Sequence, residues 1–229
     1  MPALPSLYSL RRQWLRNYTA QRISRAGVSI ISDDCWAGRL YSELGVRCRS
    51  PCVGMGFTAP EFIPFLQRIR EPHAFEVLSV SREERGYPII QTPYARLYGK
   101  HYDSETEFVR RIQRRVPLID WDNLLIKVDL GKPKFTTADI HLWNELKLPR
   151  SVAFYPDEPK FRALSIHSGV PVKKWATDGH YMFLHTCRYF SLFTWLQTGS
   201  VHPAPRWSLA YRLLFRNNVL PDSFRKFIA

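Results

Sequence analysis

The sequence lacks the short motifs that mark several large enzyme classes. It contains no glycine-rich phosphate-binding loop, no dinucleotide-binding fingerprint, no His-Glu-x-x-His zinc motif and no Gly-x-Ser-x-Gly nucleophile turn. The Gly-Met-Gly at residues 54–56 is too short to count as a phosphate loop. The chain therefore has none of the signatures of P-loop NTPases, Rossmann dehydrogenases, zincin proteases or typical α/β-hydrolases.

Cysteine is scarce as well, with four residues in a chain of 229. So few cysteines predict a reducing compartment, and we expect a cytoplasmic protein. Cys48 and Cys52 stand four residues apart, but no second Cys/His pair at zinc spacing follows them. Support for a structural zinc site is therefore weak.

Long hydrophobic runs are also missing. No uninterrupted apolar segment follows the basic start of the chain, so we expect no cleavable signal peptide. The nearest approach to a membrane span is YMFLHTCRYFSLFTWL at residues 181–196, which is too short and contains His185 and Arg188. We predict a buried or interfacial helix there.

Positive charge, by contrast, is abundant and gathers at the two ends. The net charge is +13, of which residues 1–25 carry +5 and residues 180–229 carry +5. Residues 1–25 place apolar side chains at helical spacing with arginines between them, which predicts a basic amphipathic helix. The favoured interpretation packs this helix on the domain with its arginines in water, and contact with an anionic membrane surface is the alternative. Nucleic acid comes last, because only the charge suggests it.

An apolar content of 45% indicates a globular chain, and the order of its elements predicts an α/β fold. A β-branched run at residues 28–32 leads through a polar turn into a helical pattern that stops at Gly45. Downstream, LLIKVDL at residues 124–130 and SVAFY at residues 151–155 flank a capped helical pattern. These units predict a mainly parallel sheet flanked by helices.

A β-rich insert interrupts this order between residues 75 and 102, where short strand-like runs alternate with turn residues. Beyond the core we expect a short strand at residues 164–167 and then a helical, aromatic C-terminal region. The predicted divisions are a basic amphipathic N-terminal helix at 1–25, an α/β core domain at 26–160, and a mostly helical extension at 161–229 packed on the core.

Several polar residues follow the predicted strands, at the edge where ligands gather in open parallel sheets. Asp33, Asp34 and Cys35 follow the first strand, and Asp129 and Asp157 follow two others. One of the adjacent aspartates is expected to cap the next helix, which would stabilise it by about 1 kcal/mol. The other could act as a general base or hold a divalent cation.

Three other residues have chemistry that needs an explanation. Cys35 begins a helix, where the helix dipole lowers a thiol pKa, but the adjacent carboxylates oppose this and favour an inert, buried cysteine. His101 precedes a helical pattern and is the histidine best placed for acid–base work. Lys127 stands in an apolar strand and must pair with a carboxylate or bind an anionic group. Asp120 and Asp122 precede that strand, so we expect them to order a turn at the opposite edge.

Three segments of the chain carry a resemblance to a known family. They are VSIISDDCWAGRLYSELGVRCRSPCVGMGF, GKHYDSETEFVRRIQRRVPLIDWDNLLIKVD and SVAFYPDEP. Together they resemble a bacterial family of exopolysaccharide-biosynthesis proteins with the domain of unknown function 1919, over roughly residues 26–160, about one domain. The matching positions are Ser32, Cys35, Trp36, Gly38, Ser50, Pro51, His101, Tyr102, Trp121, Asp122, Asn123 and Lys127. Members often have asparagine at Asp33 or Asp34, which weakens a reaction that needs two carboxylates.

The resemblance implies an α/β protein of cell-surface polysaccharide assembly without naming a reaction. The first hypothesis is a transferase acting on a polysaccharide or its precursor. A glycosyltransferase would use a nucleotide sugar with Mg²⁺ or Mn²⁺ on Asp33 or Asp34, whereas an acyltransferase would use acyl-CoA and His101 without a metal. The alternative is a non-catalytic protein that binds the polysaccharide or docks on the anionic inner membrane.

The candidate site follows from these hypotheses. The candidate catalytic residues are His101, Asp33 and Cys35. The candidate substrate-binding residues are Ser32, Asp34, Trp36, Ser50, Tyr102, Lys127 and Asp129.

Overall fold

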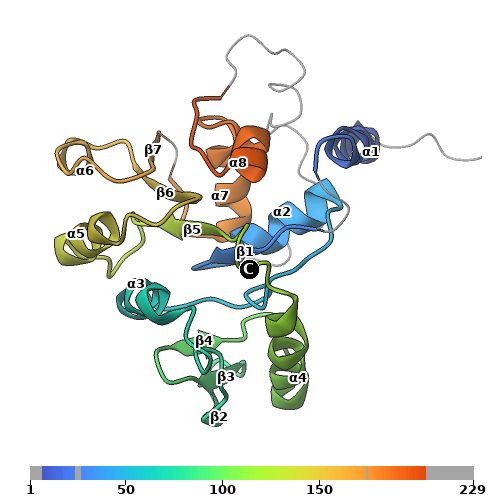
Figure 1. Ribbon diagram of the computed structural model, residues 1–229, viewed down its shortest axis with the longest axis vertical. Coiled ribbons are helices and arrows are strands. Elements are labelled where there is room, and N and C mark those ends of the chain that lie inside the picture. The colour runs from blue at the N-terminus through green and yellow to red at the C-terminus, as the bar shows by residue number, and fades with distance from the viewer. Residues whose placement is uncertain (1–6, 24–26, 174, 205–229) are drawn as a thin grey trace, which may run out of the picture.

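A parallel sheet lies at the centre of the fold (Figure 1). The computed structural model describes residues 7–23, 27–173 and 175–204. The predicted α/β architecture is confirmed, since every pairing in this sheet is parallel. The strand order is β1 (Ile30–Ser32), β5 (Leu125–Asp129), β6 (Ser151–Pro156) and β7 (Gly169–Val172).

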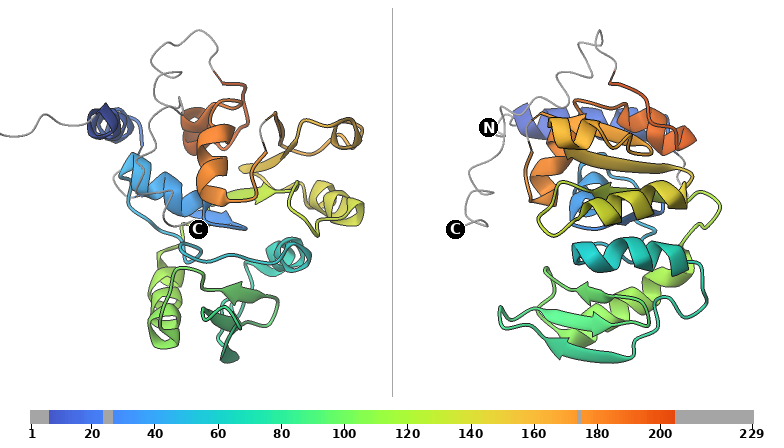
Figure 2. Two further views of the ribbon diagram at one scale, coloured as in Figure 1. Left: turned by 180° about the vertical axis from the view of Figure 1, so that it is seen from behind. Right: turned by 90° about the vertical axis from the view of Figure 1, so that its left-hand side faces the viewer.

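The strands serve two hydrophobic cores, because successive side chains of a strand point to opposite faces. Ile30 and Leu125 pack in one core, while Ile31 and Ile126 pack in the other. Figure 2 shows helices on both sides of the sheet. Those on the first side are α2 (Trp36–Leu44), α7 (Gly179–Thr186) and α8 (Leu192–Thr198), and those on the second are α3 (Ala59–Arg68) and α5 (Thr137–Leu146).

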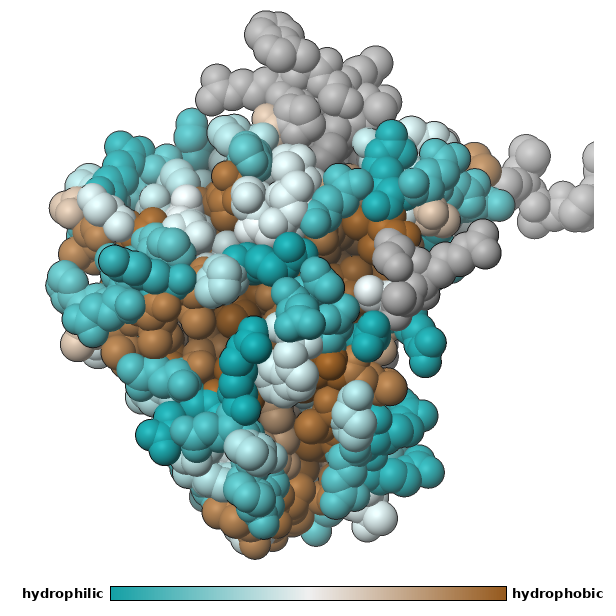
Figure 3. Space-filling view, viewed as in Figure 1, coloured by the Kyte–Doolittle hydropathy of each residue, from teal (hydrophilic) through white to brown (hydrophobic). Residues whose placement is uncertain are grey.

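The predicted β-rich insert is a separate antiparallel sheet. Its edge strand carries Val80, and Leu78 directly precedes that strand; the two are 37% and 57% exposed. Hydrophobic surface is visible at this end of the molecule in Figure 3. A hydrogen bond from the Glu107 N–H to the Ser104 hydroxyl caps the next helix. The elements are β2 (Ser79–Arg82), β3 (Pro88–Gln91), β4 (Arg96–Tyr98), α4 (Glu105–Arg115) and the 3-10 turn η1 (Val116–Leu118).

The last strand differs from the prediction. Residues 164–167 form no strand, and β7 begins at Gly169 instead. Ser165 and Ser168 adopt positive φ angles of 44° and 51°, which belong to a turn and interrupt extended backbone. The parallel sheet therefore includes a strand beyond residue 160, after the short helix α6 (Pro159–Arg162).

The apolar segment at 181–196 also differs, because two helices replace the single helix that we expected. The chain turns between α7 and α8, where Phe190 bridges to Pro203 and the Ser191 hydroxyl bonds to that of Thr194. Residues 205–229 lie outside the described part of the chain. Within the part that is described, no helix is both long enough and apolar enough to cross a bilayer.

The N-terminal helix α1 (Leu7–Ala20) packs on α2. Its arginines are not simply in water: Arg12 donates to the backbone carbonyl and hydroxyl of Ser42 at 2.8 Å, and Arg11 lies 3.3 Å from Glu43. Cations at this end of α2 also complement its dipole. The exposed side of α1 carries Leu10 and Trp14, which are 47% and 44% exposed.

Candidate functional site

A charged cluster lies buried at the carboxyl edge of the parallel sheet. Asp33 and Asp34 follow β1, and Lys127 and Asp129 lie on the adjacent strand β5. Lys127 is fully buried, and its Nζ lies 3.1 Å from Asp33 Oδ1, 2.9 Å from Asp34 Oδ1 and 2.7 Å from Asp129 Oδ2. Its ammonium group thus pairs with carboxylates, one of the two alternatives that the sequence left open.

Lys132 completes the cluster from the loop after β5. Its Nζ pairs with both Asp33 and Asp34 and lies 3.7 Å from Asp129 Oδ2. Its side chain is 17% exposed, whereas that of Lys127 is not exposed at all. Nothing in the sequence pattern singled out Lys132, although its place three residues after a strand-end aspartate was an available signal.

The pKa values of two buried carboxyl groups shift in opposite directions. Burial raises the pKa of Asp129 well above its ordinary value, and the charge of Asp34 raises it further. Burial acts on Asp34 too, but the ammonium groups of Lys127 and Lys132 hold its pKa well below the ordinary value. Burial lowers the pKa of Lys127, yet the surrounding carboxylates outweigh this effect and raise it. Of Asp34 and Asp129, Asp129 therefore binds a proton more readily.

Asp33 and Asp34 were the sequence candidates for holding a divalent cation, and the structure places Asp129 beside them. Oxygen atoms of Asp33, Asp34 and Asp129 lie within 4.8 Å of one another, a separation that a cation could bridge. The Nζ of Lys127 already lies within 3.1 Å of an oxygen of each, and Lys132 pairs with two of them. A divalent cation would have to share these oxygens with two positive charges, so the residues present do not fit Mg²⁺ or Mn²⁺.

The structure also brings Cys35 and His101 together, although 66 residues separate them in the sequence. The Sγ atom of Cys35 lies 3.1 Å from Nε2 of His101. Cys35 is partly buried and His101 is exposed. A thiol and an imidazole at hydrogen-bonding distance have the arrangement of a nucleophile and its general base.

The loop at residues 54–57 holds the two reactive residues in place. Gly56 exchanges two backbone hydrogen bonds with Tyr98, of 3.0 and 2.9 Å, and the His101 backbone N–H donates into the loop at 3.1 Å. At the other end, the loop donates a backbone N–H to the carbonyl of Asp33 at 3.0 Å. The loop therefore ties the turn after β1 to the turn after β4.

The Cys35 thiol is protonated in the resting protein. Burial raises its pKa to about 12, the Asp34 carboxylate adds to this effect, and the Lys100 ammonium opposes it. Burial is the larger cause, and the Asp34 carboxylate opposes the helix dipole as the sequence led us to expect. Cys35 can therefore act as a nucleophile only if a base removes its proton.

The start of α7 packs directly against the cluster. A Cβ atom at Gly179 would lie 2.7 Å from Asp34 Cγ, so this close approach requires glycine. On the other side, Asp34 Oδ1 accepts the N–H of Trp36 at 2.9 Å. The N-cap position of α2 is Cys35, so neither aspartate is its N-cap residue, although Asp34 accepts the first backbone N–H of the helix. The same carboxylate also pairs with both lysines.

The matched region of a known domain family contains all of these residues. The sequence profile of a family described as "Domain of unknown function (DUF1919)" matches residues 8–197. The chain belongs to this family. The DUF1919 match runs from α1 to α8 and so extends beyond residues 26–160, where the sequence resemblance was traced. An uncharacterized protein of Haemophilus influenzae (strain ATCC 51907 / DSM 11121 / KW20 / Rd) is 26% identical over 162 residues, covering 70% of this chain and 78% of that protein.

Four other candidate residues of the DUF1919 domain lie inside the protein. Each is buried and hydrogen-bonded to other protein groups, as for Trp36, whose ring N–H donates to the Thr186 hydroxyl at 2.9 Å. The four are Ser32, Trp36, Ser50 and Tyr102. Their contacts support the site from within and leave Cys35 and His101 nearer the surface.

Two further aspartates that the sequence singled out lie outside the cluster. Asp157, at the end of β6, does not join the cluster and pairs with Arg162 at 2.7 Å. Asp120 lies at the opposite edge of the sheet, where it accepts hydrogen bonds from the backbone and side-chain N–H groups of Asn123. The predicted turn before β5 is confirmed.

Proposed function

We propose that this DUF1919 protein is a transferase of cell-surface polysaccharide assembly in which Cys35 and His101 carry out acyl transfer. The observation that carries the proposal is the 3.1 Å contact between Cys35 Sγ and His101 Nε2. The polysaccharide acceptor rests on the sequence resemblance alone. A cytoplasmic site of action follows from the low cysteine content.

Because the Cys35 thiol is protonated, its reaction as a nucleophile requires a base, and His101 is placed to be that base. With a pKa of about 12, a free thiolate at pH 7 lies about 7 kcal/mol above the thiol. A preformed thiolate and imidazolium pair is therefore unfavourable here. His101 acts instead as a general base that takes the proton while the sulfur attacks.

Acyl transfer then proceeds in two balanced steps. In the first, Cys35 attacks the thioester carbonyl of acyl-CoA, His101 takes the thiol proton, and the CoA thiolate leaves and receives that proton from His101. In the second, His101 takes a proton from an acceptor hydroxyl, which attacks the acyl group on Cys35. The thiolate of Cys35 leaves and regains the proton from His101.

The charged cluster supports the acyl branch over metal-dependent glycosyl transfer. Diphosphate departure from a nucleotide sugar generally needs a divalent cation or exposed positive charge to neutralise it. The oxygens of Asp33 and Asp34 are paired with Lys127 and Lys132, and Lys127 is fully buried. The cluster is better suited to fixing the position of the turn that carries Cys35.

The test is detection of an acyl-enzyme. We expect intact-protein mass spectrometry after incubation with a panel of acyl-CoAs to show one added acyl group, located on Cys35. Cys35→Ala should abolish it, and His101→Gln should slow its formation at least about a hundredfold. Cys48→Ser is the matched control, because Cys48 is also a partly buried free thiol and should be dispensable. Acylation that persists in Cys35→Ala would overturn the proposal.

A second candidate function, docking on a membrane surface, is favoured by one observation on α1. Leu10 and Trp14 are exposed there, and tryptophan is enriched where proteins meet a bilayer interface. Flotation with anionic liposomes tests it: the Leu10→Ser, Trp14→Ser protein should lose flotation, while Leu78→Ser, at a leucine that is 57% exposed and directly precedes the antiparallel sheet, should keep it. If the wild type and both variants float equally, the exposed side of α1 does not dock on membranes.

A further inference from the structure

A cavity opens at the amino edge of the parallel sheet, opposite the cluster and Cys35. It has a volume of about 330 Å³, and the segments before β1, β5 and β6 line it together with the ends of α1 and α8. Ligand pockets in proteins span about 300–1,000 Å³, so this one is at the small end of the range. Its size favours a ligand about as large as one sugar ring over a nucleotide sugar.

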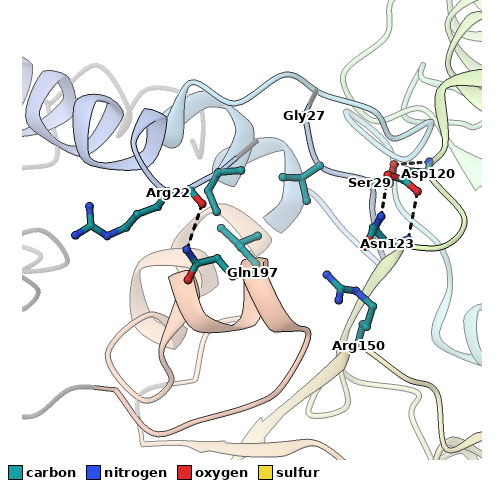
Figure 4. A pocket seen from close by; sticks show the side chains of 10 residues that line it. Arg22, Gly27, Ser29, Asp120, Asn123, Arg150 and Gln197 are labelled. Atoms are coloured by element: carbon teal, nitrogen blue, oxygen red, sulfur yellow. Dashed lines mark hydrogen bonds between the residues drawn. The ribbon is translucent and has the colours of Figure 1, made fainter. Parts of the chain in front are cut away.

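Of the two arginines among the described residues that line this cavity, only Arg150 points into it. Figure 4 shows the guanidinium of Arg150 directed inward, whereas the side chain of Arg22 points away. Arg22 lies over the Tyr18 ring, 3.5 Å from its centroid. The cavity therefore presents the positive charge of Arg150 to a ligand.

The fold holds Arg150 firmly in this position. Its backbone adopts a φ of 55°, in the left-handed region that non-glycine residues rarely occupy. Its Nη1 donates to the Thr198 carbonyl at the end of α8 at 3.2 Å. A Cβ atom at Gly199 would lie 2.4 Å from Arg150 Cγ, so the glycine that ends α8 makes room for this side chain. Local strain of this kind is often associated with functional sites.

The rest of the wall is suited to hydroxyl groups. Asn123 donates one amide N–H to Asp120 at 3.2 Å, and Gln197 donates one to the Arg22 carbonyl at 3.2 Å. Each amide carries a second N–H and a carbonyl oxygen, so one internal bond does not use its full capacity. The Asp120 carboxylate is offset by Arg49, whose Nη1 lies 3.9 Å away, and can accept a hydrogen bond from a hydroxyl.

Apolar side chains complete the lining. Ile23, Val28 and Leu196 contribute aliphatic surface beside the polar groups. A sugar ring presents C–H groups between its hydroxyls, and a mixed wall of amides and aliphatic carbons complements both. A guanidinium complements an anionic substituent on the same ring.

We propose that this cavity is a binding site for an anionic sugar, either a sugar acid or a sugar phosphate, with Arg150 contacting the anionic group. The site lies at the opposite edge of the sheet from Cys35 and takes no part in the transfer step. The proposal of a sugar-binding site therefore does not depend on acylation of Cys35.

Calorimetric titration of the full chain with D-glucuronate, D-glucose 6-phosphate and D-glucose tests the proposal. We expect at least one of the two anions to bind saturably, and neutral glucose to bind at least about tenfold more weakly, which is about 1.4 kcal/mol. The stronger of the two anions identifies the substituent that Arg150 contacts. No saturable binding of either anion, or equal binding of glucose, overturns the proposal.

Two variants place the ligand in the cavity. Arg150→Gln should weaken binding of the anion at least about tenfold, and Gln197→Glu should do the same by adding a negative charge to the wall without changing side-chain length. Arg85→Gln, in the turn between β2 and β3, is the matched control and should bind as the wild type does. Unchanged affinity in folded Gln197→Glu and Arg150→Gln proteins overturns the assignment.

Discussion

The two edges of the parallel sheet use charge in opposite ways. At the carboxyl edge, Lys127 and Lys132 lie among three carboxyl groups and their charges are balanced within the protein. At the amino edge, Arg150 is held by a backbone carbonyl and points into a cavity. A buried charge that is fully paired stabilises the structure, whereas a cation that is hydrogen-bonded to neutral groups can still form an ion pair with a ligand.

The comparison also qualifies a general rule. Open parallel sheets usually bind ligands beyond the carboxyl ends of their strands. Here that edge carries the reactive pair Cys35 and His101 at its rim, but internal ion pairs fill the space beside it. The cavity of about 330 Å³ lies at the other edge. The reactive pair and the cavity therefore lie at opposite ends of the same strands.

Removal of the central cation should have the largest effect on stability. Lys127→Met keeps the side-chain length but leaves buried carboxylates short of a partner, and we expect a loss of about 3–5 kcal/mol in the free energy of unfolding. Urea denaturation measures it. Lys160→Met removes an exposed pair with Glu158 and should change stability by less than about 1 kcal/mol. Equal losses in the two variants would contradict the structural role of the cluster.

A methyl group at the close approach of α7 should have the next largest effect. Gly179→Ala would place a Cβ 2.7 Å from Asp34 Cγ, and we expect a loss of about 1–3 kcal/mol from overpacking. Gly38→Ala is the control, since its Cβ would meet only Val53 Cγ1 at 3.4 Å and alanine favours the helix. Thermal unfolding should distinguish the two, and no difference would mean that α7 can move away from the cluster.

Neutral hydrogen bonds hold the amino edge of the sheet, so a substitution there should lower the free energy of unfolding by less than Lys127→Met does. The buried Ser29 hydroxyl accepts the Asp120 N–H at 2.8 Å and donates to the Arg49 carbonyl at 3.1 Å. Ser29→Ala removes both bonds and should cost about 1–2 kcal/mol. A loss as large as that of Lys127→Met, measured by the same urea titration, would remove the contrast between the edges.

The raised pKa of Asp129 should produce an effect of a different kind, because it depends on pH. Because the folded protein keeps a proton on Asp129 that the unfolded chain loses above its ordinary pKa of 3.8, stability falls as pH rises from there towards the raised pKa. The slope is at most about 1.4 kcal/mol per pH unit. The depressed pKa of Asp34 acts the other way, and its contribution is lost only as pH falls well below 3.8.

Asp129→Asn should remove this slope, since the amide has no proton to lose. Unfolding free energies measured from pH 4 to pH 8 should decline less steeply in the variant than in the wild type. Parallel curves would show that Asp129 is ionised in the folded protein.

Much of the carboxyl edge was predictable from the sequence. Strand-end positions placed Asp33, Asp34 and Asp129 at one edge, because parallel strands end on the same side. Lys127 stands in an apolar strand, and a buried ammonium group requires a partner. The strand expected at residues 164–167 was wrong because positive φ angles at Ser165 and Ser168, which the side chains do not reveal, make that segment a turn.

The contacts between distant segments were not predictable. No spacing in the sequence relates Cys35 to His101, since the loop at residues 54–57 brings them together by backbone hydrogen bonds. The cavity at the amino edge draws its walls from five segments between Arg22 and Gln197. The helical spacing of α1 likewise could not predict that its arginines contact α2.

The sequence by itself determined the parallel α/β fold, the antiparallel insert and the edge at which the aspartates lie. These follow from periodicity, capping residues and strand direction, which are local properties of the chain. Only the tertiary structure decided which charges are paired, which thiol meets which imidazole, and where a cavity remains. Those outcomes depend on distances between segments far apart in the chain, and packing alone sets such distances.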